Sequence, residues 1–131
     1  MAERKKKAGT QLRPLEAQVL QFAVLGEMTG LLQRVRANKS KRSASVLVKT
    51  GPIRVEVLAQ DEGGEVASHD ADGPFTIQCL LGRVLISIQG HDQRLTSGDL
   101  LVVDAGVPHD ITAEEASVLL VTKTSAEEQS Q

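Results

Sequence analysis

Aromatic side chains are almost absent from this sequence of 131 residues, which contains no Trp, no Tyr and two Phe. A core must therefore be built from Val, Leu and Ile, because hydrophobic residues still make up 40% of the chain. The lack of Trp and Tyr argues against a platform on which nucleic-acid bases stack, since such platforms need flat aromatic faces. The length is typical of one globular domain that buries a sizeable core.

Cysteine is equally scarce, with Cys79 as the single example. One cysteine excludes a disulfide framework and a cysteine-rich zinc site, so we expect a buried and unreactive thiol. No apolar run reaches the length of a membrane-spanning helix, and no apolar stretch follows the basic N-terminal segment as it would in a secretory signal. The sequence therefore predicts a cytoplasmic protein that does not associate with membranes.

The net charge of −2 hides an uneven distribution of charge along the chain. Residues 1–51 contain 11 Lys or Arg and 3 Asp or Glu, a net charge of +8, whereas residues 52–131 contain 4 and 14, a net charge of −10. A basic arm on an acidic body can bind nucleic acid, or it can bind the acidic body of a second copy. The second interpretation needs no outside partner, so we expect a homodimer and no nucleic acid.

From Ser45 onward, short apolar runs rich in Val and Ile alternate with turn residues about every ten residues. No helix-length segment intervenes, which favours an antiparallel sandwich or small barrel. Two of the runs, SVLLVT and DLLVVD, are apolar on both faces and need cover from the N-terminal segment or from a partner subunit. The runs that we expect to form strands are SVLVKT, IRVEVLAQ, FTIQCLL, RVLISIQ, QRLTS, DLLVVD, HDITA and SVLLVT.

The N-terminal part of the chain has a different pattern. Apolar residues recur at helical spacing over residues 15–37, although residues 19–25 also fit a strand. The sequence is therefore expected to divide into four segments, namely a disordered basic tail (1–14), a helical segment with its connector (15–43), a β-barrel (44–124) and a disordered C-terminal tail (125–131).

The stretch SGDLLVVDAGVPHDITA places two glycines and a histidine, Gly98, Gly106 and His109, at fixed spacing. This spacing resembles the second motif of the cupin family, G-x5-P-x-G-x2-H-x3-N. The Pro and Asn positions of the motif are Asp104 and Ala113 here, so three of its five residues match.

The first cupin motif, G-x5-H-x-H-x3,4-E-x6-G, can also be placed on the sequence. Gly63 and Gly82 match its glycines, and His69 matches its first histidine. The second histidine position is Ala71, and the glutamate position is Phe75. The frame is intact, but two of its three metal-binding side chains are replaced.

The resemblance to cupins covers residues 63–121 and implies an all-β fold, a double-stranded β-helix or jelly-roll barrel, preceded here by a short helical N-terminal segment. In the family, three His and one Glu hold a divalent metal, and this sequence keeps only His69 and His109 of the four. A redox or Lewis-acid metal needs about three protein ligands. We therefore expect no cofactor, with a divalent metal held by the two histidines as the alternative.

These features favour a small cupin-domain protein that binds a small molecule in its barrel and lacks the full metal ligand set. The alternative is a metal-dependent enzyme of dioxygenase or isomerase type, with atypical ligands that include His69 and His109. A third hypothesis, a nucleic-acid-associated regulator that uses the basic segment 34–49, lacks the helix-turn-helix that usually accompanies it.

The side chains expected to point into the barrel follow from the motif positions and from strand alternation. Alternation relative to the motif positions also predicts that Val84, Leu100 and Val102 point inward. His91 is expected to lie in a hairpin turn. The expected pocket residues are His69, Ala71, Phe75, Ile77, Cys79, Ile86 and His109.

Overall fold

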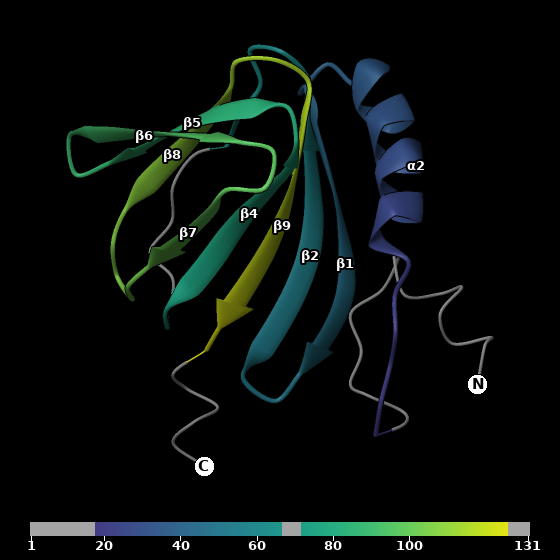
Figure 1. Cartoon of the computed structure of the whole chain (residues 1–131), viewed down its shortest axis with the longest axis vertical. Coiled ribbons are helices and arrows are strands. Elements are labelled where there is room, and N and C mark those ends of the chain that lie inside the picture. The colour runs from purple at the N-terminus through teal and green to yellow at the C-terminus, as the bar shows by residue number, and fades with distance from the viewer. Residues whose placement is uncertain (1–17, 67–71, 126–131) are drawn as a thin grey trace.

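A computed structural model describes residues 18–66 and 72–125, which form two facing antiparallel sheets and one helix (Figure 1). The all-β fold predicted from the sequence is confirmed. The larger sheet has the strand order β1 (Arg42–Thr50), β2 (Ile53–Gln60), β9 (Ser117–Thr124), β4 (Phe75–Leu81) and β7 (Leu100–Val103). The smaller sheet has the order β3 (Glu65–Val66), β8 (His109–Ala113), β5 (Arg83–Ile88) and β6 (His91–Thr96).

All eight runs expected to be strands form strands, and β3 is an additional short one. The prediction for His91 is wrong in detail. The turn between β5 and β6 lies at Gln89 and Gly90, and His91 is the exposed first residue of β6. Gly90 has a positive φ of 81°, so it supplies the left-handed backbone that the tight turn needs.

Between the two sheets lies a closed apolar core. The inward residues of β4 and β5 alternate with outward ones, as the pleat of a strand requires. Aliphatic side chains dominate this core because the sequence offers so few aromatic ones. Its buried members are Leu58, Phe75, Ile77, Cys79, Val84, Ile86, Leu95, Val103, Ile111, Ala113, Leu119 and Val121.

Helix α2 (Val24–Arg36) builds a second core on the outer face of the larger sheet, where Figure 1 shows it packed beside β1 and β2. Leu31 and Val35 of the helix are fully buried against Val57 of β2 and Val118 of β9. Of the two alternatives for covering the doubly apolar run SVLLVT, the N-terminal segment or a partner subunit, the N-terminal segment covers its Val118. Among the described residues, no helix is long and apolar enough to span a membrane.

The helix is shorter than the periodicity over residues 15–37 predicts. Residues 18–23 form neither helix nor strand, so the strand alternative over 19–25 is also wrong. No side chain caps the first turn, because Ala23 occupies the N-cap position and has no side-chain hydrogen-bond acceptor. Residues 15–17 and both expected tails, 1–14 and nearly all of 125–131, lie outside the described residues.

The outer face of β7 has no such cover from the described part of the chain. Leu100 and Val102 are 58% and 65% exposed, and the prediction that they point inward is wrong. The inward residues of β7 are Leu101 and Val103, which pair with Ile77 and Phe75. Leu101 and Val103 share the parity of His109, which also points inward, whereas the predicted residues 100 and 102 share the parity of the motif glycines, Gly98 and Gly106.

Candidate functional site

His109 is the first residue of β8 and directly follows the turn DAGVP. Gly106 in this turn has a positive φ of 75°, a conformation that glycine adopts without strain. The ring of His109 is partly buried, and its Nδ1 lies 3.3 Å from the carbonyl oxygen of Val107. Its centroid lies 4.7 Å from that of the Phe75 ring, at an interplanar angle of 36°. The turn therefore directs His109 toward the ring at the family's glutamate position.

The structure brings together four of the residues that we expected to line a pocket. These residues, Phe75, Ile77, Cys79 and Ile86, are almost fully buried in the core between the sheets. Burial raises the pKa of the Cys79 thiol, which keeps it protonated and poorly nucleophilic. His109 joins this group through its contact with Phe75, whereas His69 and Ala71 lie outside the described residues.

The described residues do not form a metal site. Within residues 18–66 and 72–125, no group of three or more His, Cys, Asp or Glu side chains could hold a metal ion. Where the family motif has a glutamate, the Phe75 ring offers no donor atom and packs against His109. The donors within the described residues do not by themselves fit a divalent metal.

The glycines that match the two cupin motifs all have positive φ angles, as residues in tight turns often do. This backbone geometry accounts for the four glycines of the motif frame, which are present although two of the four metal-binding side chains are replaced. The four glycines are Gly63, Gly82, Gly98 and Gly106.

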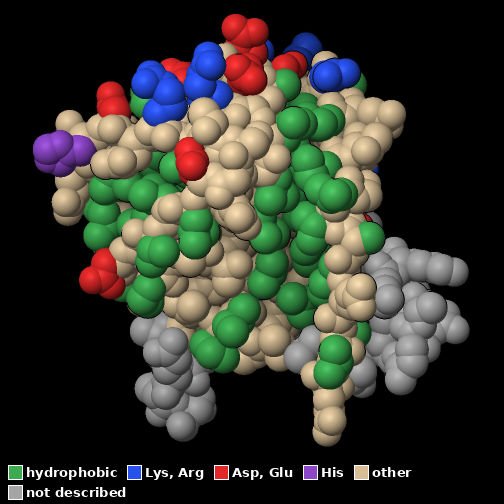
Figure 2. Space-filling model, in the orientation of Figure 1, with side chains coloured by type: hydrophobic (Ala, Val, Ile, Leu, Met, Phe, Trp, Pro, Cys, Tyr) green, Lys and Arg blue, Asp and Glu red, His purple; other side chains and the backbone are tan. Residues whose placement is uncertain are grey.

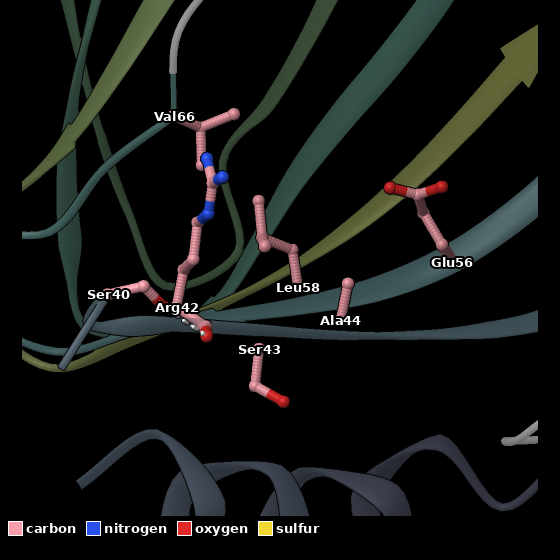
Figure 3. A pocket seen from close by; sticks show the side chains of 7 residues that line it. All are labelled: Ser40, Arg42, Ser43, Ala44, Glu56, Leu58 and Val66. Carbon is pink, nitrogen blue, oxygen red and sulfur yellow. Dashed lines mark hydrogen bonds between the residues drawn. The ribbon is translucent and has the colours of Figure 1, made fainter. Parts of the chain in front are cut away.

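A pocket of about 310 Å³ lies where β1 and β2 of the larger sheet meet β3 of the smaller one. In Figure 3, the side chains of Arg42, Leu58 and Glu56 rise from the face of these strands that points away from α2. Leu58 also belongs to the core between the two sheets. The pocket therefore lies on the face of β1 and β2 that points into the barrel. The residues that line it are Ser40, Arg42, Ser43, Ala44, Glu56, Leu58 and Val66.

Glu56 is the unexpected residue of this pocket, because a glutamate in a strand is usually exposed. It is only 8% exposed, and its carboxylate lies 3.1 Å from Arg54 Nε and 3.7 Å from Lys123 Nζ. The alignment with Arg54 is poor, so Glu56 Oε2 and Arg54 Nε are buried without a hydrogen bond to any described residue. An acceptor in this state leaves part of its desolvation cost uncompensated.

Sequence reasoning missed Glu56 because alternation separates two faces without saying which one points inward. The run IRVEVLAQ alternates between one apolar and one more polar face. Its apolar residues Val57 and Ala59 pack against α2, and its polar residues Glu56 and Gln60 face the barrel. The neighbouring strand SVLLVT carries the signal that could have revealed Glu56. It is apolar on both faces, which indicates that both faces of this sheet are covered.

Beside the pocket lies a second, polar hollow of about 460 Å³, and Arg42 and Val66 belong to the walls of both. The other residues that line the second hollow are Glu65, Ser87, Asp110 and Thr112. Arg42 therefore stands between a mostly apolar pocket and an acidic surface hollow.

Neither a family model nor a curated protein matches the sequence. Solved structures do match the fold. A conserved protein of unknown function from Streptococcus pyogenes is 20% identical, with a TM-score of 0.63, over 90% of this chain and 96% of that one. A cupin superfamily protein from Desulfitobacterium hafniense is 16% identical, with a TM-score of 0.65, over 88% of this chain and 99% of that one.

A third match is the salicylate 1,2-dioxygenase of Pseudaminobacter salicylatoxidans, at 18% identity and a TM-score of 0.67. The match covers 76% of this chain but only 33% of the dioxygenase. At these identities the likeness concerns the fold. With its two facing sheets and its motif glycines in left-handed turns, the chain is a cupin-fold protein.

Proposed function

We propose that this protein binds a small molecule in the barrel and does so without the full set of cupin metal ligands. The observation that carries the proposal is the pocket of about 310 Å³ on the inner face of β1 and β2, which lies within the usual size range of small-molecule sites. Apolar side chains from Ala44, Leu58 and Val66 line it beside the charged groups of Arg42 and Glu56. A few polar groups on an apolar surface are typical of such sites.

Ligand-observed NMR with a set of small carboxylates, alcohols and amines tests this proposal. An Ala44→Trp variant should fill the pocket and abolish the signals of every compound that binds there. Gln33→Trp adds the same ring to the exposed face of α2 and serves as the matched control. Equal binding by both variants and the unmodified protein would place the ligand elsewhere, and the proposal would then be wrong.

The prediction that His69 and His109 face a ligand stays a separate proposal, since His109 is not among the described residues that line this pocket. The metal-dependent alternative is also kept. The comparison with a dioxygenase of the same fold favours keeping that alternative. If it is right, elemental analysis of the purified protein should find close to one equivalent of a divalent metal. This metal should be lost in the His69→Ala/His109→Ala double variant. A metal content near zero, restored by no added Fe²⁺, Mn²⁺, Ni²⁺ or Zn²⁺, would eliminate the enzyme alternative.

We further propose that the protein is a homodimer in which a second copy covers the outer face of β7. Leu100 and Val102 are exposed there, Leu81 of β4 is 41% exposed, and β7 is an edge strand of the larger sheet. Figure 2 shows hydrophobic side chains gathered down the middle of the visible face, where Figure 1 places β4, β7 and β9. An apolar edge of this kind favours association with another copy. The opposite charges of the two halves of the sequence favour the same partner.

A further inference from the structure

The charged and apolar side chains that line the pocket follow one another along β1 and β2 in an order that indicates the class of ligand. In the register of β1 and β2, Arg42 is opposite Gln60, Ala44 is opposite Leu58, and Val46 is opposite Glu56. Arg42 and Glu56 are therefore two rows apart, and these rows are separated by about 13 Å along the strands. The apolar side chains of Ala44 and Leu58 lie between them, as Figure 3 shows.

Arg42 supplies a positive charge at one end of the pocket. Its guanidinium forms no ion pair with any carboxylate in the described residues, although Glu65 and Asp110 line the neighbouring hollow. A guanidinium binds a carboxylate through two parallel hydrogen bonds, which makes it a good receptor for an organic anion. This end of the pocket should therefore recognise a carboxylate.

Glu56 supplies an acceptor at the other end. Its Oε2 atom is buried against Arg54, so a ligand in the pocket would reach Oε1, which accepts no hydrogen bond from the described residues. A ligand that donates one to Oε1 would recover free energy. Arg54 and Lys123 already place two positive charges beside this carboxylate. A ligand ammonium would add a third and be repelled, and a neutral donor such as a hydroxyl is therefore favoured.

We infer that the pocket selects an organic anion with an apolar body, whose carboxylate binds Arg42 and whose far end donates a neutral hydrogen bond to Glu56. This inference rests on the proposed function and deepens it. It names a class of ligand, an ω-hydroxy carboxylate, rather than a particular compound.

Isothermal titration with four probes of equal chain length tests the inference on the full chain. The probes are 8-hydroxyoctanoate, octanoate, 8-aminooctanoate and octan-1-ol. We expect 8-hydroxyoctanoate to bind about threefold more tightly than octanoate, because it adds one neutral hydrogen bond. We expect octan-1-ol to bind about tenfold more weakly than octanoate, because it lacks the charge-assisted pair. The amino compound should bind more weakly than the hydroxy compound.

Two variants assign the ends of the ligand. Arg42→Gln should remove the advantage of octanoate over octan-1-ol, and Arg36→Gln on the exposed end of α2 should leave it unchanged. Glu56→Gln should reduce the advantage of the hydroxyl group, and Glu56→Ala should abolish it while leaving octanoate binding in place. Circular dichroism confirms that each variant is folded.

The outcomes separate the inference from the proposed function. If octan-1-ol binds as tightly as octanoate in a pocket that Ala44→Trp blocks, the small-molecule function stands and the inferred ligand class is wrong. If none of the four probes binds and compounds of the NMR set do not bind either, both are wrong.

Discussion

At the scale of single residues, Gly82 shows how closely two distant segments of the chain approach each other. It sits between β4 and β5 with a φ of +88°. A Cβ atom at this position would lie 2.3 Å from the carbonyl oxygen of Ala116 and 2.3 Å from Ser117 Oγ. Ser117 Oγ in turn accepts a hydrogen bond of 2.9 Å from the backbone N–H of Arg83. The glycine therefore permits the contact that joins the start of β9 to the β4–β5 turn.

Gly82→Ala should lower the free energy of unfolding by about 3 kcal/mol, since the left-handed conformation costs about 1 to 2 kcal/mol and relief of the clash adds to it. Gly90→Ala is the matched control, because Gly90 has a similar φ of +81° but no heavy atom within 4 Å of its added Cβ. It should show the conformational cost alone. Urea denaturation of both variants checks this, and equal losses would mean that the backbone around residue 82 yields easily.

At the scale of elements, a single carboxylate ties together three parts of the smaller sheet. Glu114, in the turn between β8 and β9, accepts hydrogen bonds from Arg94 Nε of β6 at 2.7 Å and from Arg83 Nε of β5 at 3.0 Å. The hydrogen bonds from Arg94, and then those from Arg83, hold the pKa of the Glu114 carboxyl below its ordinary value of 4.5. The edge strand β6 is thereby fastened to its neighbours at one end.

Glu114→Gln should make the protein less stable at pH 7 and should have no such effect in acid. A carboxyl group whose pKa is lowered by folding stabilises the fold above its ordinary pKa, and this stabilisation disappears as pH falls through the lowered value. Melting temperatures measured from pH 7 down to pH 3 should begin to converge for the two proteins below about pH 4.5 and continue to converge as pH falls through the lowered pKa. Because the pairs are near the surface, 1 M salt should shrink the difference at pH 7. A difference that persisted unchanged at pH 3 would contradict the ion-pair explanation.

The elements also show what the sequence could predict and what it could not. Alternation and turn glycines located the strands, because a period of two is a local property of the chain. The inward side of β7 follows from alternation only when the count starts at His109, because Leu101 and Val103 share its parity and the motif glycines Gly98 and Gly106 have the opposite one. The inward position of Glu56 depends on α2 covering the opposite face, which is a tertiary property.

At the scale of the whole molecule, the exposed face of β7 makes the dimer testable. Val102→Lys should shift the protein to a monomer, because a charge cannot be buried without a partner in an apolar interface. Val19→Lys changes another exposed valine, outside the helix and the sheets, and should leave the dimer intact. Light scattering at micromolar concentration measures the mass of each. A monomer for the unmodified protein would show the homodimer proposal to be wrong.

The position of β9 has a consequence for how the protein is made. This strand is the last of those in the described residues, yet it lies between β2 and β4 in the larger sheet and pairs with both along most of its length. While the ribosome is still synthesising residues 117–124, the strands that flank the gap have no partner at their facing edges, and the two cores that Val118 and Leu119 complete remain open. The barrel must therefore close after its last strand has emerged, and chains that end before Ser117 would carry unpaired apolar edges prone to aggregation.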